Sequence, residues 1–193
     1  MAHHRDLSTW EAIGCAVAGL LTALACSLTA PPAIAVLSGY LLFTTIAITI
    51  VDYRSFIIPD IFSLPAIPLG IVANLISADA GLHSSAVADS LIGAAVGGSS
   101  FYLLRSSYRR FRGFEGLGMG DVKLATAAGA WVGLEALPIV LFMATGAAVS
   151  AVAVRYVIGA KESITRTTPI PFGTFLAPSL WLIWFYRAVV API

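Results

Sequence analysis

The stretch Ala33–Val51, AIAVLSGYLLFTTIAITIV, determines how the rest of the sequence is read. None of its residues is charged, and Asp52 follows at once. A helix needs about 20 mostly apolar residues to cross the hydrocarbon core of a bilayer, so this stretch predicts a membrane-spanning helix that ends at a carboxylate.

The whole chain has the composition of a membrane protein. Of its 193 residues, 59% are hydrophobic and 11% are charged, and the mean hydropathy is +0.91. These charges are too few to cover a water-facing surface, which excludes a soluble globular enzyme. The net charge of +1 excludes a nucleic-acid-binding protein that uses a broad basic field, and the length fits a single domain over residues 1–193. Cys15 and Cys26 have no metal-binding spacing, so neither a zinc site nor a disulfide framework is indicated.

Apolar runs separated by polar breaks predict six or seven spanning helices. The first run could be a signal peptide, but no A-x-A site precedes a polar mature domain, so we expect a retained helix. Val122–Leu134 is short for a full crossing and predicts a helix that is tilted or starts below the membrane surface. No alternating strand pattern appears, and a bilayer offers no partners to free backbone groups, so we expect an all-α bundle. The runs are Trp10–Leu28, Ala33–Val51, Ile61–Ser77, Ala86–Leu104, Val122–Leu134, Pro138–Ile158 and Phe172–Val190.

Two pairs of glycines spaced four apart, Gly93/Gly97 and Gly129/Gly133, predict close packing between helices.

The basic residues predict how the bundle is oriented. If the N-terminus is cytoplasmic, 10 of the 11 Lys and Arg residues fall at cytoplasmic ends, and only Arg187 lies outside. The segment Arg105–Arg112 is then most simply an anchor to anionic lipid headgroups. The cytoplasmic ten are Arg5, Arg54, Arg105, Arg109, Arg110, Arg112, Lys123, Arg155, Lys161 and Arg166.

Two aspartates are predicted at the cytoplasmic mouth of the bundle. Asp52 closes the second span, and Asp121 opens the fifth after the glycine-rich approach GLGMGD. Two close carboxylates in a poorly solvated site do not both ionise, so one can accept a proton from water while the other donates a proton to a carbonyl oxygen. This is aspartyl-protease chemistry, which requires neither a metal nor another cofactor. Gly118 and Gly120 would let an extended substrate strand pass close to Asp121.

A purely structural interpretation stays open for each acid. Asp121 and Asp60 both stand where a helix N-cap is expected, Asp60 directly after Pro59. Asp79, Asp89, Glu115, Glu135 and Glu162 are expected to be ordinary surface or capping residues.

Three motifs in one order resemble those of the type IV prepilin peptidases. VDYRSFIIPD, residues 51–60, is similar to the segment in which an aspartate is followed, several residues on, by an aliphatic residue, proline and a second aspartate. Gly118-Met119-Gly120-Asp121 resembles the family's GxGD motif, and Pro171-Phe172-Gly173 resembles the segment that begins its last helix. The resemblance covers about Ala33 to Val190.

The resemblance implies an enzyme and its substrate. It makes Asp52 and Asp121 the catalytic pair of an aspartic endopeptidase, with Asp60 in a supporting role. It implies a multi-pass protein of the bacterial inner membrane that removes the short basic leader of a prepilin or pseudopilin at the cytoplasmic face. Arg54 or Lys123 could pair with a substrate glutamate, although contact with lipid or charge balance with Asp52 or Asp121 is the simpler expectation.

The chain departs from the family's long members in three respects. It lacks the cytoplasmic CxxC insert that accompanies N-methyltransferase activity, Arg54 stands where a second acid is common, and Thr174 stands where proline is frequent. We therefore expect the short, peptidase-only form that resembles the processing enzymes of Flp or tight-adherence pili. The substrate pilin and the oligomeric state stay open.

Other functions are also compatible with intramembrane acids. A small proton-coupled transporter would place its acids near mid-span and show an internal repeat, and a noncatalytic assembly subunit would show no proteolysis. A rhomboid-like serine protease lacks its histidine in a facing span. Presenilin-like GxGD proteases have a Tyr-Asp order, whereas this chain has Asp52-Tyr53.

Overall fold

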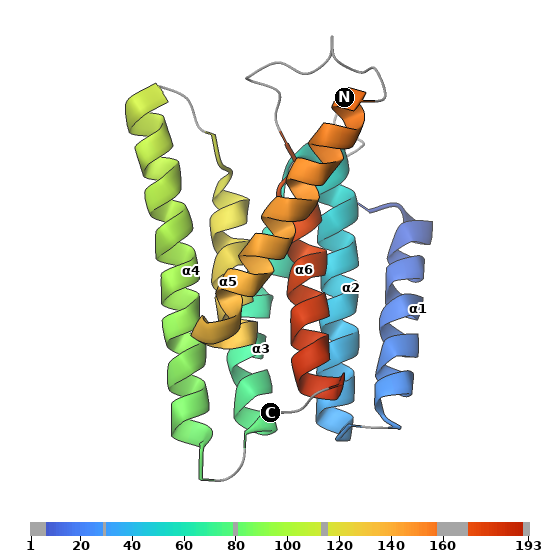
Figure 1. Ribbon diagram of the computed structural model, residues 1–193. Coiled ribbons are helices and arrows are strands. Elements are labelled where there is room, and N and C mark those ends of the chain that lie inside the picture. The colour runs from blue at the N-terminus through green and yellow to red at the C-terminus, as the bar shows by residue number, and fades with distance from the viewer. Residues whose placement is uncertain (1–6, 29, 79–80, 113–115, 158–169, 191–193) are drawn as a thin grey trace.

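The computed structural model describes residues 7–28, 30–78, 81–112, 116–157 and 170–190, and these residues form a bundle of helices without a strand (Figure 1). Within these described ranges, six helices are long and apolar enough to cross a membrane, which confirms the expected all-α membrane bundle. They are α1 (Thr9–Cys26), α2 (Pro32–Ser55), α3 (Asp60–Ser77), α4 (His83–Arg112), α5 (Met119–Val157) and α6 (Gly173–Phe185), which continues into the π-helical turn η2 (Tyr186–Val190).

Helix α5 combines two runs that the sequence analysis separated. At Gly133 the backbone leaves the helical region, with φ 73° and ψ −179°, and Figure 1 shows the chain reversing direction there. We call Met119–Gly133 the first arm of α5 and Leu134–Val157 the second arm. The first arm reaches about 22 Å at about 1.5 Å per residue, short of a hydrocarbon core of about 30 Å. In Figure 1 it begins below the upper end of α4, in agreement with a helix that starts below the membrane surface.

Side chains from other elements satisfy the backbone groups that the reversal leaves free. Asn74 of α3 donates to the carbonyl oxygens of Ala130 and Trp131, at 3.0 and 2.8 Å. Arg187 of η2 donates to the carbonyl oxygen of Val132 at 2.6 Å. On the other side of the bend, Asp89 of α4 accepts a hydrogen bond from the Leu134 N–H at 3.0 Å. These contacts matter because a broken helix inside a membrane finds no water to bind its free groups.

Close backbone contact joins α4 to the first arm of α5. A Cβ atom added at Gly129 would meet the carbonyl group of Gly93, and one added at Gly97 would meet the carbonyl of Ala125. The predicted packing role of Gly93, Gly97 and Gly129 is confirmed. Gly133 differs, because its positive φ makes it the point of reversal.

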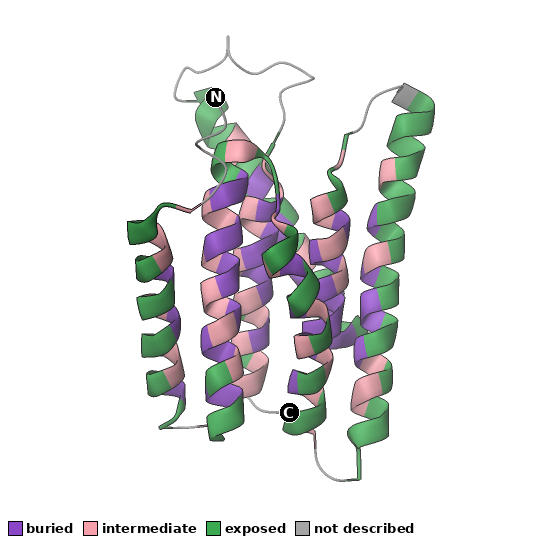
Figure 2. Cartoon of the chain, turned by 180° about the vertical axis from the view of Figure 1, so that it is seen from behind, coloured by how far each residue is buried: buried purple, intermediate pink, exposed green. Residues whose placement is uncertain are grey.

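Burial is concentrated at the centre of the bundle (Figure 2). The first arm of α5 is the most buried element, and Trp131 there is fully buried, donates to the Ala66 carbonyl at 2.7 Å and packs edge-on against Trp184. By contrast, α1 exposes large apolar side chains along its outer face, as a lipid-facing helix does. The start of α1 and the end of η2 lie at opposite ends of the bundle in Figure 1, because α5 reverses.

Candidate active site

Asp52 lies in the last turn of α2, and its side chain is buried within the helical bundle. The residue is only 4% exposed. The helix ends one turn later at Phe56, which adopts a left-handed conformation with φ 54° and donates its N–H to the Asp52 carbonyl at 2.9 Å. A bulky residue rarely adopts this conformation, and such strained residues concentrate at functional sites.

The first turn of α6 binds the Asp52 carboxylate. The Thr174 N–H donates to Asp52 Oδ2 at 2.8 Å, and Thr174 Oγ1 donates to the same oxygen at 3.2 Å. A Cβ atom at Gly173 would lie 3.0 Å from Asp52 Oδ2 and 2.7 Å from the Ile58 side chain. The glycine therefore allows α6 to approach the carboxylate this closely.

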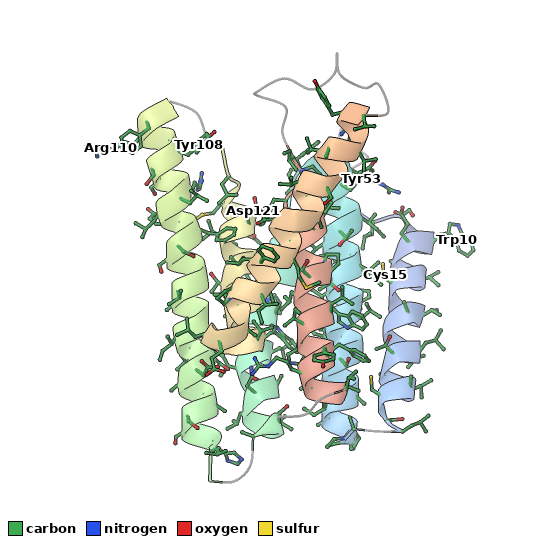
Figure 3. All side chains as sticks on the ribbon, viewed as in Figure 1. Trp10, Cys15, Tyr53, Tyr108, Arg110 and Asp121 are labelled. Atoms are coloured by element: carbon green, nitrogen blue, oxygen red, sulfur yellow. The ribbon has the colours of Figure 1, made fainter. Side chains whose placement is uncertain are left out.

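Asp121 lies in the first turn of α5, where it was expected. Its Oδ2 accepts a hydrogen bond from the Gly118 N–H at 3.1 Å. Asp121 was expected at the N-cap position, but it is the third residue of α5, and its carboxylate binds the N–H of Gly118, which precedes the helix. Its Oδ1 is buried and has no hydrogen-bond partner within the part of the chain that the structure describes. Figure 3 places Asp121 toward the end of the bundle where Tyr53, Tyr108 and Arg110 lie.

The two carboxylates share one cavity. They are 69 residues apart in the sequence, yet they interact electrostatically and both line a cavity of about 180 Å³. The cavity is partly open, since the backbone before Asp121 and the chain after α2 form its walls. The other lining residues are Phe56, Ile57, Ile58, Gly118, Met119 and Gly120.

Gly120 lies against this wall, since a Cβ atom there would be 2.7 Å from the Ile58 Cβ, whereas Gly118 is exposed. Phe172 is the N-cap residue of α6 and packs against Phe101 at a ring distance of 5.9 Å. Pro171 precedes it and is partly buried. The motif Pro171-Phe172-Gly173 therefore anchors the end of α6 that contacts Asp52.

Two expectations about charged residues were wrong. Asp60 makes no N-cap hydrogen bond, because Pro59 occupies the N-cap position of α3 and the Asp60 carboxylate binds Lys123 Nζ at 2.6 Å. Arg54 binds Glu11 of α1. Charge balance with Asp52 or Asp121 was the other expectation, but Lys123 is paired with Asp60 and Arg54 is paired with Glu11.

Sequence reasoning gave Thr174 no role beyond a departure from the family pattern. A hydroxyl side chain in the first helical turn, directly after Pro-Phe-Gly, is the signal that could have identified it. Asn74, Asp89 and Arg187, which hold the reversal of α5, carry no local signal, because their partners lie 45 to 57 residues away. Among the residues described, no three His, Cys, Asp or Glu side chains are grouped to hold a metal ion.

The arrangement is suited to acid–base chemistry on a bound water. Two carboxylates face a small cavity with restricted access to solvent, one held by two donors and the other with a free oxygen. A water between them could lose a proton to one carboxylate while the other protonates a substrate atom.

Comparison with known proteins gives consistent matches. Residues 39–154 match the type IV leader peptidase family. The prepilin leader peptidase/N-methyltransferase of Aeromonas hydrophila is 35% identical over 86% of this chain and 56% of its own length. The protein of the same name from Burkholderia pseudomallei is 35% identical over 82% of this chain and 49% of its own length. The leader peptidase HopD of Escherichia coli is 35% identical over 68% of this chain and 81% of its own length. The chain thus spans about half the length of the first two relatives, and no solved structure matches it significantly.

Proposed function

Because this chain belongs to the type IV leader peptidase family, we propose that it is an aspartic endopeptidase that cleaves the leader from a prepilin or pseudopilin. The observation that carries the proposal is the shared cavity, in which Asp52 and Asp121 meet from two distant helices. The relatives named as prepilin leader peptidases support the substrate class.

The proposed reaction uses one water molecule and two carboxylates. The ionised carboxylate takes a proton from the water, whose oxygen attacks the scissile carbonyl carbon, while the protonated carboxylic acid donates to the carbonyl oxygen. The tetrahedral intermediate then collapses. Its C–N bond breaks, and the leaving amine takes the proton that the base had removed from water. As the carbonyl group of the product re-forms, one hydroxyl group of the intermediate returns its proton to the acid. Both carboxylates return to their starting states, and no cofactor is consumed.

The position of the cavity supports cleavage at the cytoplasmic face of the bacterial inner membrane. The end of the bundle near Asp121 also carries Arg110, and the basic residues predict that this end faces the cytoplasm (Figure 3). Exposed Gly118 allows a substrate strand to pass beside Asp121. The hydrophobic helix of a pilin precursor would remain in the lipid while its polar leader reaches the cavity.

Asp60 and Lys123 have a supporting role in this proposal. Their ion pair joins the start of α3 to the N-terminal part of α5, two residues after Asp121. The Arg54 contact with Glu11 similarly joins α1 to the end of α2, two residues after Asp52.

A cleavage assay on membranes tests the proposal. The chain is co-expressed with a candidate prepilin, and leader removal is followed as a mobility shift on a gel. Asp52→Asn and Asp121→Asn should each reduce cleavage by at least about 100-fold, since an amide cannot take or return a proton, and the double variant should be no worse. Glu135→Gln is the matched control, because Glu135 is exposed beside the bend of α5. Near-normal cleavage by well-folded Asp52→Asn or Asp121→Asn would rule out the mechanism.

The alternative of a proton-coupled transporter gains no support. A transporter would place its acids near the middle of the spans, whereas Asp52 and Asp121 line a cavity beside the chain connections that follow α2 and precede α5. The named relatives are peptidases.

A further inference from the structure

The two aspartates of the cavity have unequal surroundings. Asp52 Oδ2 accepts two hydrogen bonds from Thr174, one from the backbone N–H and one from the hydroxyl group. Asp121 Oδ2 accepts one hydrogen bond, from Gly118, while its buried Oδ1 has no partner among the described residues. The difference indicates that the two carboxylates do not exchange roles freely.

We propose that Thr174 is a positioning residue that keeps Asp52 as the base that activates water, and so leaves Asp121 as the acid that carries the proton. This inference rests on the peptidase function proposed above and assigns the two steps of that reaction to specific side chains.

Hydrogen-bond donors identify Asp52 as the ionised member. Donors directed at a carboxylate favour its charged form, and two of them converge on Oδ2. The Thr174 N–H is free to do this because the first N–H groups of a helix have no partner within the helix. The start of α6 also carries a partial positive charge, which adds to the stabilisation of a carboxylate there. Since Oδ2 is occupied, Oδ1 is the oxygen left to take the proton from water.

The free oxygen identifies Asp121 as the protonated member. A buried polar atom without a partner is rare in folded proteins and is commonly associated with a functional role. A protonated carboxyl group becomes a hydrogen-bond donor, and an extended substrate beside Gly118 would present a carbonyl oxygen to it. An unpartnered oxygen at the cavity is therefore what the proton-donating acid requires before substrate binds.

The Thr174 hydroxyl also has a second acceptor within reach. Its Oγ1 lies 3.5 Å from the Thr49 carbonyl oxygen, compared with 3.2 Å from Asp52 Oδ2. One hydroxyl proton cannot serve both acceptors fully. The hydroxyl group can thus bind Asp52 while the carboxylate is charged and turn toward Thr49 once Asp52 has taken the proton.

Two substitutions at position 174 isolate the contribution of the hydroxyl donor. Thr174→Ser keeps both donors, and Thr174→Val keeps the N–H donor but removes the hydroxyl group. Thr126→Val is the matched control. Thr126 of α5 is half-buried, as Thr174 of α6 is, but its hydroxyl group donates to the Val122 carbonyl of its own helix and not to a carboxylate.

Steady-state cleavage of a prepilin by each purified variant gives the first readout. We expect Thr174→Val to lower kcat about 10- to 100-fold with KM unchanged, which is the loss expected for one hydrogen bond to a charged group. Thr174→Ser and Thr126→Val should stay within about threefold of the wild type. An unchanged kcat in Thr174→Val, or a Thr174→Ser variant as impaired as Thr174→Val, would overturn the inference.

Labelling with a hydrophobic carbodiimide gives a readout that does not depend on cleavage, because this reagent attacks protonated carboxyl groups. Peptide mass spectrometry should find the label on Asp121 in the wild type and increasingly on Asp52 in Thr174→Val. A wild type that labels mainly at Asp52, or a Thr174→Val variant with the wild-type pattern, would show that the Thr174 hydroxyl group does not set the protonation of the pair. If the wild type labels as expected but cleaves no prepilin, the peptidase proposal fails while the assignment of the proton stands.

Discussion

Replacing Gly129 by alanine tests whether the first arm of α5 needs backbone contact with α4. A Cβ atom at position 129 would meet the carbonyl group of Gly93 and the amide nitrogen of Ala94. These are backbone atoms of a long helix and cannot turn aside as a side chain would. The two helices would have to separate by on the order of 1 Å to reach ordinary contact distances.

The expected cost follows from that displacement. Adding a methyl group to a packed interior costs about 1–3 kcal/mol, and the upper part of this range applies where only backbone can yield. For a chain of this size, 1 kcal/mol corresponds to about 2–4 °C, so Gly129→Ala should lower Tm by about 4–12 °C in detergent. Asp121 lies two turns away on the same arm, and a 1 Å displacement of a catalytic group can cost about 100-fold in rate. Cleavage should therefore fall at least tenfold while the protein is still folded.

Gly146→Ala is the control for this experiment. Gly146 lies in the second arm of α5, is exposed, and has no atom within 4 Å of a Cβ placed on it. Alanine is the better helix former, so Tm should stay level or rise slightly and cleavage should not change. A Gly129→Ala variant with the wild-type Tm and cleavage would refute the close contact between α4 and α5.

Three further predictions concern charge, orientation and product. Asp60→Ala and Lys123→Met should each reduce cleavage less than tenfold, since a half-exposed ion pair contributes about 0–1 kcal/mol. The double variant should reduce cleavage no further than either single variant. An inactive Asp60→Asn variant beside an active Asp52→Asn variant would instead move the catalytic pair to Asp60 and Asp121. In a background without the native cysteines, Ser107→Cys should react with an impermeant thiol reagent only from the cytoplasmic side, and labelling from the periplasm would exclude cytoplasmic cleavage. Pilin processed by this chain alone with S-adenosylmethionine present should have an unmethylated N-terminus by mass spectrometry, and an added methyl group would contradict a peptidase without methyltransferase activity.

The apolar runs predicted most of the fold because the bilayer imposes one requirement on every span. Ala33–Val51 was expected as a helix and lies within α2, and Asp121 opens α5 as expected. The separate runs Val122–Leu134 and Pro138–Ile158 predicted a change of direction between them, which α5 makes. Its position at Gly133 was not predictable, because a glycine four residues after Gly129 fits helix packing and a bend equally well. The partners that decide between them come from three other elements.

In the candidate site, Gly118, Gly120 and the two aspartates, which line the same cavity, were predictable from the sequence. The positions of the two aspartates at span ends follow from the hydropathy pattern, which is a local property of the sequence. The hydrogen bonds of Thr174 to Asp52 join residues 122 positions apart, and the Asp60 contact with Lys123 joins residues 63 apart. Such pairings depend on how helices pack, and no periodicity within one helix encodes them.

The reversal of α5 has a consequence for how the protein is made. When the ribosome has produced the first arm, Asn74 and Asp89 have already been synthesised, but the partner of the Val132 carbonyl, Arg187, has not. The donors that hold Asp52 also belong to this last segment, at Thr174. The nascent chain therefore contains both aspartates before Thr174 can bind Asp52. Synthesis of α6 and η2 supplies both the partner of the Val132 carbonyl and the donors to Asp52. If the proposed peptidase function holds, we expect no cleavage until these last elements have been made.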